Sequence, residues 1–241
     1  MLLCIAPPWQ WTSMLMNEKP YSSKPALYGL KYVTLMPQRL LARNQTEMNI
    51  DHAILFEIFK DLSFSKSEES FILSRLEKQS LNKGDVLLKA SEKVMNQYYV
   101  HRGCLRTFFI DASGKEHTLQ FAIHNWWISD YTAFFSSGNA IMHIETLEDS
   151  CIYKLSKHHM DELFNRVPAL DRFFRKKMEK SFASFQKRIL SSLAQSAKQR
   201  YLSFIEAYPN IEQTVKNYHI ASYLGITTET LSRIRKEISR A

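Results

Sequence analysis

The chain has 241 residues, of which 45% are hydrophobic and 12% aromatic, so it can bury a core in one large domain or two small ones. Its formal net charge of +8 at pH 7 favours an anionic partner, although basic proteins without one also exist. The three cysteines, Cys4, Cys104 and Cys151, are too few and too widely spaced for a disulfide framework or a zinc motif, which fits a reducing cytoplasm. No stretch approaches the roughly 18 to 20 apolar residues of a membrane span, so we expect no membrane partner.

Residues 1–47 hold repeated prolines and no sustained apolar period, and we predict a poorly structured extension there. A folded domain is predicted over residues 48–167. It opens with short helices, and between Leu81 and Leu155 it changes to short β-branched and aromatic runs broken by turn residues. These runs recur roughly every 8 to 12 residues, which is typical of an all-β sandwich or barrel. A jelly roll is the expected form.

After Val167 the sequence predicts one helix of about 25 residues, because apolar side chains recur every three or four positions behind Pro168. Either this apolar stripe packs on its own β domain, or it forms the seam of a parallel homodimer. The helix is long for a domain of this size and its other faces are basic, so we favour the dimer and assign residues 168–195 to a dimerisation helix. The predicted seam consists of Phe174, Met178, Phe182, Phe185 and Ile189.

The strongest functional pattern lies in residues 217–238, within a predicted DNA-binding domain of residues 196–241. Two short apolar faces are separated by Gly225, where the chain can turn sharply because glycine reaches positive φ easily. Ala221 supplies the small side chain that two crossing helices need where they approach. Thr227 is placed to cap the second helix through its hydroxyl. Together these features predict a helix-turn-helix.

The second helix of this motif carries polar side chains suited to a DNA major groove. Glu229 and Arg233 lie one turn apart with Ser232 beside them, and an arginine binds guanine as a fork while a glutamate accepts from cytosine N4. The alternative is an ordinary exposed ion pair, which the preceding helix and turn make the weaker interpretation. The predicted DNA contacts are Thr228, Glu229, Ser232, Arg233, Arg235 and Lys236 on this helix, and Lys216, Tyr218 and His219 at the first one.

In this order of elements the span from Leu81 onward resembles the Crp/Fnr family of regulators. The segment GITTETLSRIRK is similar to the family's recognition helix, with its E-x-x-S-R pattern on Glu229, Ser232 and Arg233. The resemblance implies an α+β fold: an N-terminal β-roll or jelly roll of the cyclic nucleotide-binding type, a long dimerisation helix and a C-terminal winged helix-turn-helix. It further implies a cytoplasmic, homodimeric transcription regulator, not an enzyme, whose partners are double-stranded DNA and RNA polymerase.

The region aligned with the family's phosphate-binding cassette departs from the pattern. Cyclic nucleotide binders carry Gly-Glu and, further along, Arg-Ser, whereas here Ser129-Asp130 and Ala140-Ile141 take those places. Loss of the arginine removes a charge-assisted pair worth roughly 1.5 to 3 kcal/mol, and Ile141 is expected to crowd the site. We therefore predict no cyclic AMP binding, and no iron–sulfur cluster because four clustered thiolates are lacking. No cofactor or metal is expected.

The same region holds a concentration of aromatic side chains beside Tyr131. They either fill the core of the roll, which we favour, or line a pocket for an apolar small-molecule effector of unknown identity. The residues of the degenerate effector pocket are Ser129, Asp130, Tyr131, Ala140 and Ile141, and the neighbouring aromatics are Trp126, Trp127, Phe134 and Phe135.

Two other classes of protein stay open. A cupin-like metalloenzyme needs two histidines at H-x-H spacing with a further glutamate and histidine, a spacing that His117, His124, His143 and Glu145 do not make. A module that binds only protein partners would carry a degenerate DNA-binding end. Steep loss of DNA affinity with rising salt separates a DNA binder from the latter.

Overall fold

The computed structural model describes residues 53–240, which belong to one compact unit. The predicted extension of residues 1–47 and Cys4 lie outside this range. None of the described helices is long and apolar enough to cross a membrane.

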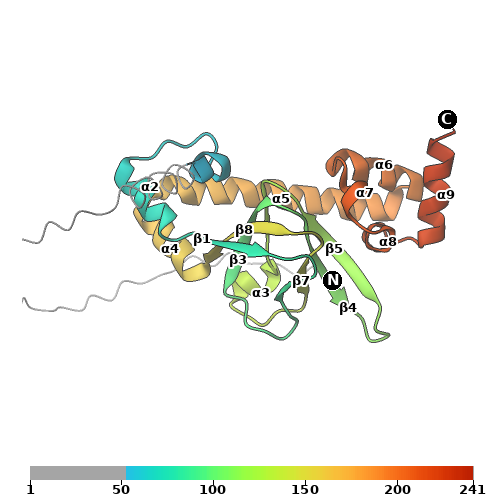
Figure 1. Ribbon diagram of the computed structural model, residues 1–241, viewed down its shortest axis with the longest axis horizontal. Helices are drawn as coiled ribbons and strands as arrows, with labels where there is room; N and C mark the ends of the chain where they lie inside the picture. Colours follow the sequence, from blue (N-terminus) through green and yellow to red (C-terminus); the bar gives the residue numbers. More distant parts are fainter. Residues whose placement is uncertain (1–52, 241) are drawn as a thin grey trace, which may run out of the picture. The chain divides into compact units, whose positions relative to one another are not determined.

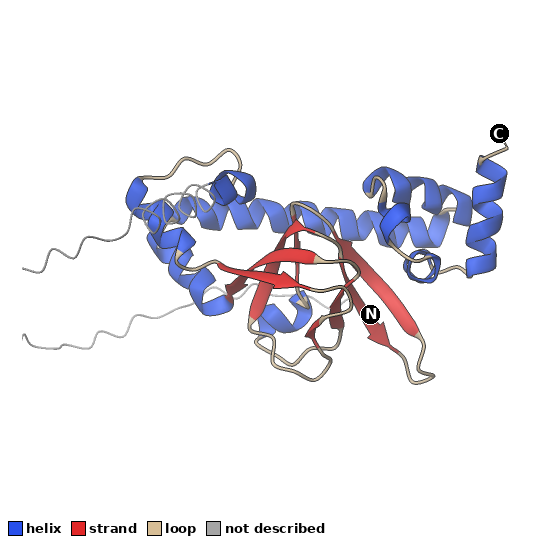
Figure 2. Ribbon diagram, in the orientation of Figure 1, coloured by secondary structure: helices blue, strands red, loops and turns tan. Residues whose placement is uncertain are grey.

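Two four-stranded antiparallel sheets form the first part of the described chain (Figure 2). Their strand orders are β1-β8-β3-β6 and β2-β7-β4-β5. The strands are β1 (Glu77–Leu81), β2 (Val86–Leu88), β3 (Asn96–Arg102), β4 (Leu105–Ile110), β5 (Glu116–Ala122), β6 (Trp126–Ile128), β7 (His143–Thr146) and β8 (Ser150–Ser156). The β-roll predicted from the short β-branched and aromatic runs is confirmed, with β5 at the edge of the second sheet.

The helices flank this roll and then continue to the C-terminal end (Figure 1). Residues 53–58 are helical, and Ser65 with Glu68 forms the capping box that begins α2. The helices that follow are α2 (Lys66–Leu73), α3 (Tyr131–Ser136), α4 (Lys157–Arg166), α5 (Pro168–Ala194), α6 (Ala197–Ala207), α7 (Ile211–Thr214), α8 (Asn217–Leu224) and α9 (Thr228–Ile238).

Two apolar clusters hold these elements together. The larger one fills the roll and includes the helix of residues 53–58 and the beginning of α5, where Leu170 and Phe174 are buried. The smaller cluster joins helices α6 to α9 to the roll through Phe121 of β5, Cys104 and Leu147. The helical end is therefore packed directly on the second sheet.

The C-terminal part differs from the resemblance in one respect. Every regular element in residues 197–240 is a helix, so the β wing of a winged helix-turn-helix has no counterpart there. The short segment 208–216 between α6 and α8 folds into α7, which leaves no length for a hairpin.

Candidate functional site

Helices α8 and α9 form the predicted corner. Gly225 ends α8 with φ 66° and ψ 36°, and its N–H donates to the carbonyl groups at the end of that helix. The hydroxyl of Thr227 accepts from the backbone N–H of Thr230 at 3.2 Å, which caps α9. Ile220 and Leu231 are fully buried between the helices. A side chain at position 225 would be strained, because L residues rarely adopt this φ.

The outward side of α9 presents the polar residues expected to read DNA. Glu229, Ser232, Arg233 and Lys236 are exposed, and Thr228 is half-buried. Arg233 forms no hydrogen bond or ion pair with the residues that the structure describes. The Ser232 hydroxyl donates to the Thr228 carbonyl at 2.9 Å, so its lone pairs stay available as acceptors.

Glu229 is a prearranged anionic acceptor at the beginning of α9. Backbone and side-chain hydrogen bonds at the N-terminus of α9, those from Thr227 and Thr228 included, lower the pKa of its carboxyl group. An ionised carboxylate at a helix N-terminus is also favoured by the helix dipole. It is one helical turn from Arg233, as the spacing predicts.

Arg235, in contrast, is engaged inside the module. Its guanidinium lies 2.7 Å from Glu212 Oε1 of α7 and donates to Asn217 Oδ1 at 2.6 Å and to the Tyr201 hydroxyl at 3.2 Å. The prediction that Arg235 contacts DNA does not fit this position, because the side chain lies on the flank of α9 that packs towards α6 and α7. Its guanidinium therefore connects α9 to α6, α7 and α8.

His219 also differs from its prediction. Only 5% of it is exposed, so it is not the surface group that a phosphate contact requires. Burial, together with the nearby charge of Arg106, lowers its pKa to about 4. Tyr218 and Lys216 remain exposed, with the Lys216 ammonium 5.8 Å from the Tyr218 ring centre.

The buried state of His219 predicts a pH-dependent stability. Its folded pKa lies below the ordinary 6.5, so between about pH 6.5 and pH 4 the unfolded chain takes up a proton that the folded chain does not. Stability is therefore lost as pH falls, by about 1 to 2 kcal/mol at pH 5 relative to pH 7. Urea unfolding at both pH values measures this. The loss should shrink in His219→Gln and persist in His158→Gln, an exposed control; equal losses in both variants would contradict the assignment.

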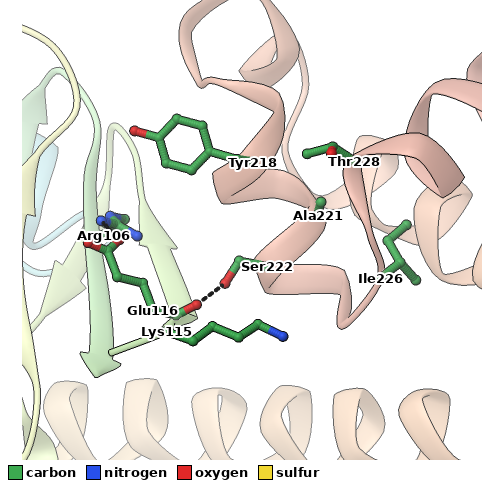
Figure 3. A pocket seen from close by; sticks show the side chains of 8 residues that line it. All are labelled: Arg106, Lys115, Glu116, Tyr218, Ala221, Ser222, Ile226 and Thr228. Carbon is green, nitrogen blue, oxygen red and sulfur yellow. Dashed lines mark hydrogen bonds and ion pairs between the residues drawn. The ribbon is translucent and has the colours of Figure 1, made fainter. Parts of the chain in front are cut away.

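Helix α8 is docked on the edge strand β5 by Ser222 (Figure 3). The backbone N–H of Thr118 donates to Ser222 Oγ at 2.9 Å, and the Ser222 hydroxyl donates to the Glu116 carbonyl at 3.0 Å. One side chain thus satisfies two groups of a strand edge that has no neighbouring strand. Arg188 of α5 adds donors to the carbonyl oxygens of Leu119 and Tyr223.

A pocket of about 330 Å³ lies beside this contact. Figure 3 shows the roll's Arg106, Lys115 and Glu116 on one side and the helix-turn-helix on the other. Arg106 is 2% exposed and bridges Glu116 and Glu145, which fixes the strand to which α8 is docked.

The segment aligned with the phosphate-binding cassette contains a buried carboxylate, that of Asp130. Asp130 is fully buried and caps α3, accepting from the N–H of Ala133 at 3.2 Å. Its other oxygen accepts from the N–H groups of Ile141 at 2.8 Å and Met142 at 3.1 Å. Ile141 itself is 62% exposed, so the expected crowding by its side chain is wrong: the side chain points away because the backbone faces Asp130.

The remaining cassette residues pack within the roll. Ser129 is buried and donates to the Asn96 carbonyl at 2.8 Å, and Ala140 is buried as well. The Tyr131 hydroxyl lies 3.3 Å from Gln97 Oε1. The neighbouring aromatics divide, since Phe134 is fully buried whereas Phe135 is 49% exposed.

Two more of these aromatic side chains join separate elements instead of lining one chamber. Trp127 contacts Tyr99 and Phe174, with ring centres 5.4 and 5.2 Å apart. Trp126 lies 5.3 Å from the Tyr208 ring in the helical end. These placements favour the interpretation of the aromatics as packing residues.

The apolar stripe of α5 splits into two parts. Phe174 is buried on the roll and Met178 is half-buried. Further along, Phe182 is 63% exposed, and Phe185 and Ile189 are each 46% exposed. The sequence period therefore marks two different surfaces on one helix.

The histidines weighed for a cupin-like site are separated. His117 pairs with Asp111 at 2.7 Å, and Glu145 is bound to Arg106. His143 stacks on Phe108 with ring centres 5.1 Å apart. His124 instead joins Glu57 and His101, a grouping that the sequence analysis missed because the three residues are far apart along the chain.

Comparison with known proteins agrees with this architecture. Residues 78–167 match the family model of the cyclic nucleotide-binding domain. The fumarate and nitrate reduction regulatory protein of Salmonella typhi is 25% identical over 170 residues, which cover 65% of this chain and 66% of the relative. The anaerobic regulatory protein of Pasteurella multocida is 25% identical over 174 residues, covering 65% of this chain and 61% of the relative. The match thus spans slightly less than two thirds of these relatives.

Solved structures show the same fold. FixK2 from Bradyrhizobium japonicum superposes with a TM-score of 0.61 at 15% identity, covering 68% of this chain and 85% of that one. A putative transcriptional regulator of the Crp/Fnr family from Eubacterium rectale gives a TM-score of 0.59 at 19% identity, covering 76% and 87%. The chain is therefore similar in sequence and fold to transcription regulators of the Crp/Fnr family, and its residues 78–167 match the cyclic nucleotide-binding domain.

Proposed function

We propose that this protein is a sequence-specific regulator that binds double-stranded DNA with α9 in the major groove. The observation that carries the proposal is the outward position of Glu229, Ser232 and Arg233 on a helix whose apolar side is buried. Arg233 binds guanine O6 and N7, and Glu229 accepts from cytosine N4 one turn away. Lys236 and Lys216 contact phosphates, which position the helix without reading sequence.

The protein acts as a homodimer through the exposed part of α5. Phe182, Phe185 and Ile189 lie along one side of this helix and are exposed in the single chain, an arrangement that supports a parallel helix pair. Two recognition helices then enter successive major grooves about 34 Å apart and read a pseudo-palindrome. The operator is therefore expected to have two half-sites.

The β-roll is a sensor domain that no longer binds a cyclic nucleotide. Ala140 stands where the family's arginine would meet the phosphate, and the Asp130 carboxylate already accepts from the N–H groups of Ile141 and Met142. A phosphate bound in this place would lie close to the Asp130 carboxylate, and the two negative charges would repel each other. Any effector is a different ligand.

A signal in the roll reaches α8 through β5. Ser222 bonds to both Glu116 and Thr118, so a shift of this strand moves the helix that precedes the recognition helix. The protein works in the cytoplasm, with RNA polymerase as a further partner and without enzymatic activity. The location, the partner and the lack of catalysis are what a role in regulating transcription implies.

Selection of bound DNA from a random pool, followed by binding measurements on variants, tests this proposal. Arg233→Ala should cost about 1 to 3 kcal/mol on the selected site and relax the preference at one position. The matched control Lys236→Ala removes a charge from the same helix and should weaken all sequences alike. Equal loss on selected and random DNA for Arg233→Ala would contradict base reading.

Salt dependence separates the regulator from a module that binds only proteins. Affinity should fall steeply with salt concentration, because each phosphate contact releases counterions. A chain that recovers no DNA from the pool and shows no salt-dependent binding does not carry out this function.

A further inference from the structure

Three side chains with metal-ligating groups converge on one side of the roll. Glu57 comes from the helix of residues 53–58, His101 from β3 and His124 from the turn between β5 and β6. Each offers a ligand atom within 4.8 Å of the others, and within residues 53–240 this is the one such grouping. It belongs to neither the DNA-reading surface nor the degenerate cassette.

The spacing of these groups suits a small divalent ion. Glu57 Oε1 lies 2.9 Å from His101 Nδ1, and the ligand atoms of all three residues lie within 4.8 Å of one another. Ligand atoms about 2.0 to 2.1 Å from a tetrahedral metal lie about 3.3 Å from one another. A bound ion draws the most distant ligand atom in by up to about 1.5 Å, and its binding releases the protons that the ligand atoms carry.

Neighbouring groups orient the ligands as they do in metal sites. His124 Nδ1 donates to the backbone carbonyl of His101 at 2.7 Å, which fixes its proton and leaves the lone pair of Nε2 free. The hydroxyl of the buried Tyr99 donates to Glu57 Oε1 at 2.9 Å. The Tyr153 ring lies edge-on to His101, with ring centres 6.0 Å apart.

The site is also accessible. The side chain of His124 is 54% exposed and that of His101 is 39% exposed, whereas Glu57 is 23% exposed. An ion enters from the solvent side, and the buried Tyr99 closes the other side. Three protein ligands leave a fourth position for water.

We propose that Glu57, His101 and His124 bind a divalent transition-metal ion. Two imidazoles and one carboxylate are a donor set used by Zn²⁺ and by non-haem Fe²⁺. The absence of a thiolate or of further carboxylates argues against Cu⁺ and against Mg²⁺ or Ca²⁺.

Metal binding fastens the helix of residues 53–58 to the roll. Phe59 lies just beyond this helix and is fully buried, with its ring 5.3 Å from Phe173 and 6.2 Å from Phe174 of α5. The ion therefore strengthens a connection between β3 and the long helix. Ligand binding to the folded state alone raises its melting temperature.

The test adds Zn²⁺ to the metal-free full-length chain. One equivalent should bind, raise the melting temperature and give an X-ray absorption spectrum with two imidazole ligands. Anaerobic Fe²⁺ in competition with Zn²⁺ determines which ion the site prefers. Absence of stoichiometric binding of either ion, or a bound ion without histidine scattering, overturns the proposal.

Variants locate the ion. Zn²⁺ affinity should fall at least about tenfold in each of the variants Glu57→Gln, His101→Gln and His124→Gln. This is the lower limit of the loss that substitutions around a bound metal typically cause. His124 is exposed, so its replacement leaves the fold intact even if the other two variants are unstable. The control His117→Gln disrupts a histidine–carboxylate pair with Asp111 that has no third ligand, and it should bind Zn²⁺ normally. Unchanged affinity in His124→Gln would place the ion elsewhere.

Discussion

Replacing both Phe182 and Phe185 with aspartate should convert the protein to a monomer in sedimentation velocity experiments. The two phenylalanines are 63% and 46% exposed in the single chain, so each leaves a large part of its apolar surface open to solvent. Burying a side chain of this size contributes about 1.5 to 3 kcal/mol, and a dimer buries four of them. Their loss therefore weakens dimerisation by on the order of 6 kcal/mol, or about four powers of ten in Kd.

The same variant should lose most of its affinity for a palindromic operator while each chain stays folded. A monomer reaches one half-site, and the gain from linking two binding events disappears. The matched control is the pair Lys180→Gln and Ser184→Asp, which changes net charge by the same two units at exposed positions on another face of α5. An unchanged dimer in the aspartate variant would place the subunit contact elsewhere.

The sequence period of α5 predicted its length well but not its two surfaces. Each step of four residues overshoots one turn of the helix by about 40°, so the apolar stripe drifts and Phe182 lies about 120° around the helix from Leu170. Which of these side chains meets the roll depends on how the β domain packs against the helix. In the structure Met178 is half-buried, and the apolar side chains beyond it are exposed although Arg188 still bonds to β5.

The corner of the helix-turn-helix could be predicted from the sequence because it depends on local interactions. Gly225, Thr227 and Ala221 act through neighbours in sequence, which a pattern can reveal. The surroundings of His219 are set by Arg106 of β4 and Glu116 of β5, and those of Arg235 by Glu212 of α7, which are all distant in sequence. The sequence predicts both side chains to be exposed because they are polar residues of helices, whereas contacts from other elements bury His219 and engage Arg235.

The contacts within the cassette and the histidine cluster could not be predicted from the types of residues in the sequence. A missing arginine is visible in the sequence, whereas the use of Asp130 to satisfy the N–H groups of Ile141 and Met142 is not. Glu57, His101 and His124 come together only through strand register and the placement of an N-terminal helix. No spacing rule reports such a grouping.

The second large effect is expected at Arg106, whose guanidinium is 2% exposed. It pairs with Glu145 at 2.6 Å and with Glu116, donates to Thr118 Oγ1 at 3.1 Å and lies 3.9 Å from the Phe108 ring. Arg106→Met keeps much of the volume but leaves two carboxylates without their counter-charge. Breaking a buried pair costs about 3 to 5 kcal/mol, and we expect the lower end because Glu116 is 42% exposed.

Urea unfolding measures this loss of stability, and two further variants test whether it comes from the uncompensated charges. Arg75→Met removes a pair with Glu162 whose side chains are 28% and 34% exposed, and it should cost less than about 1 kcal/mol. Adding Glu116→Gln and Glu145→Gln to Arg106→Met should restore much of the lost stability, because no uncompensated charge remains. The Glu116 carbonyl accepts from Ser222, so Arg106→Met should also loosen α8 and increase hydrogen exchange there. If Arg106→Met costs no more than Arg75→Met, the buried charge does not hold the strand on which α8 is docked.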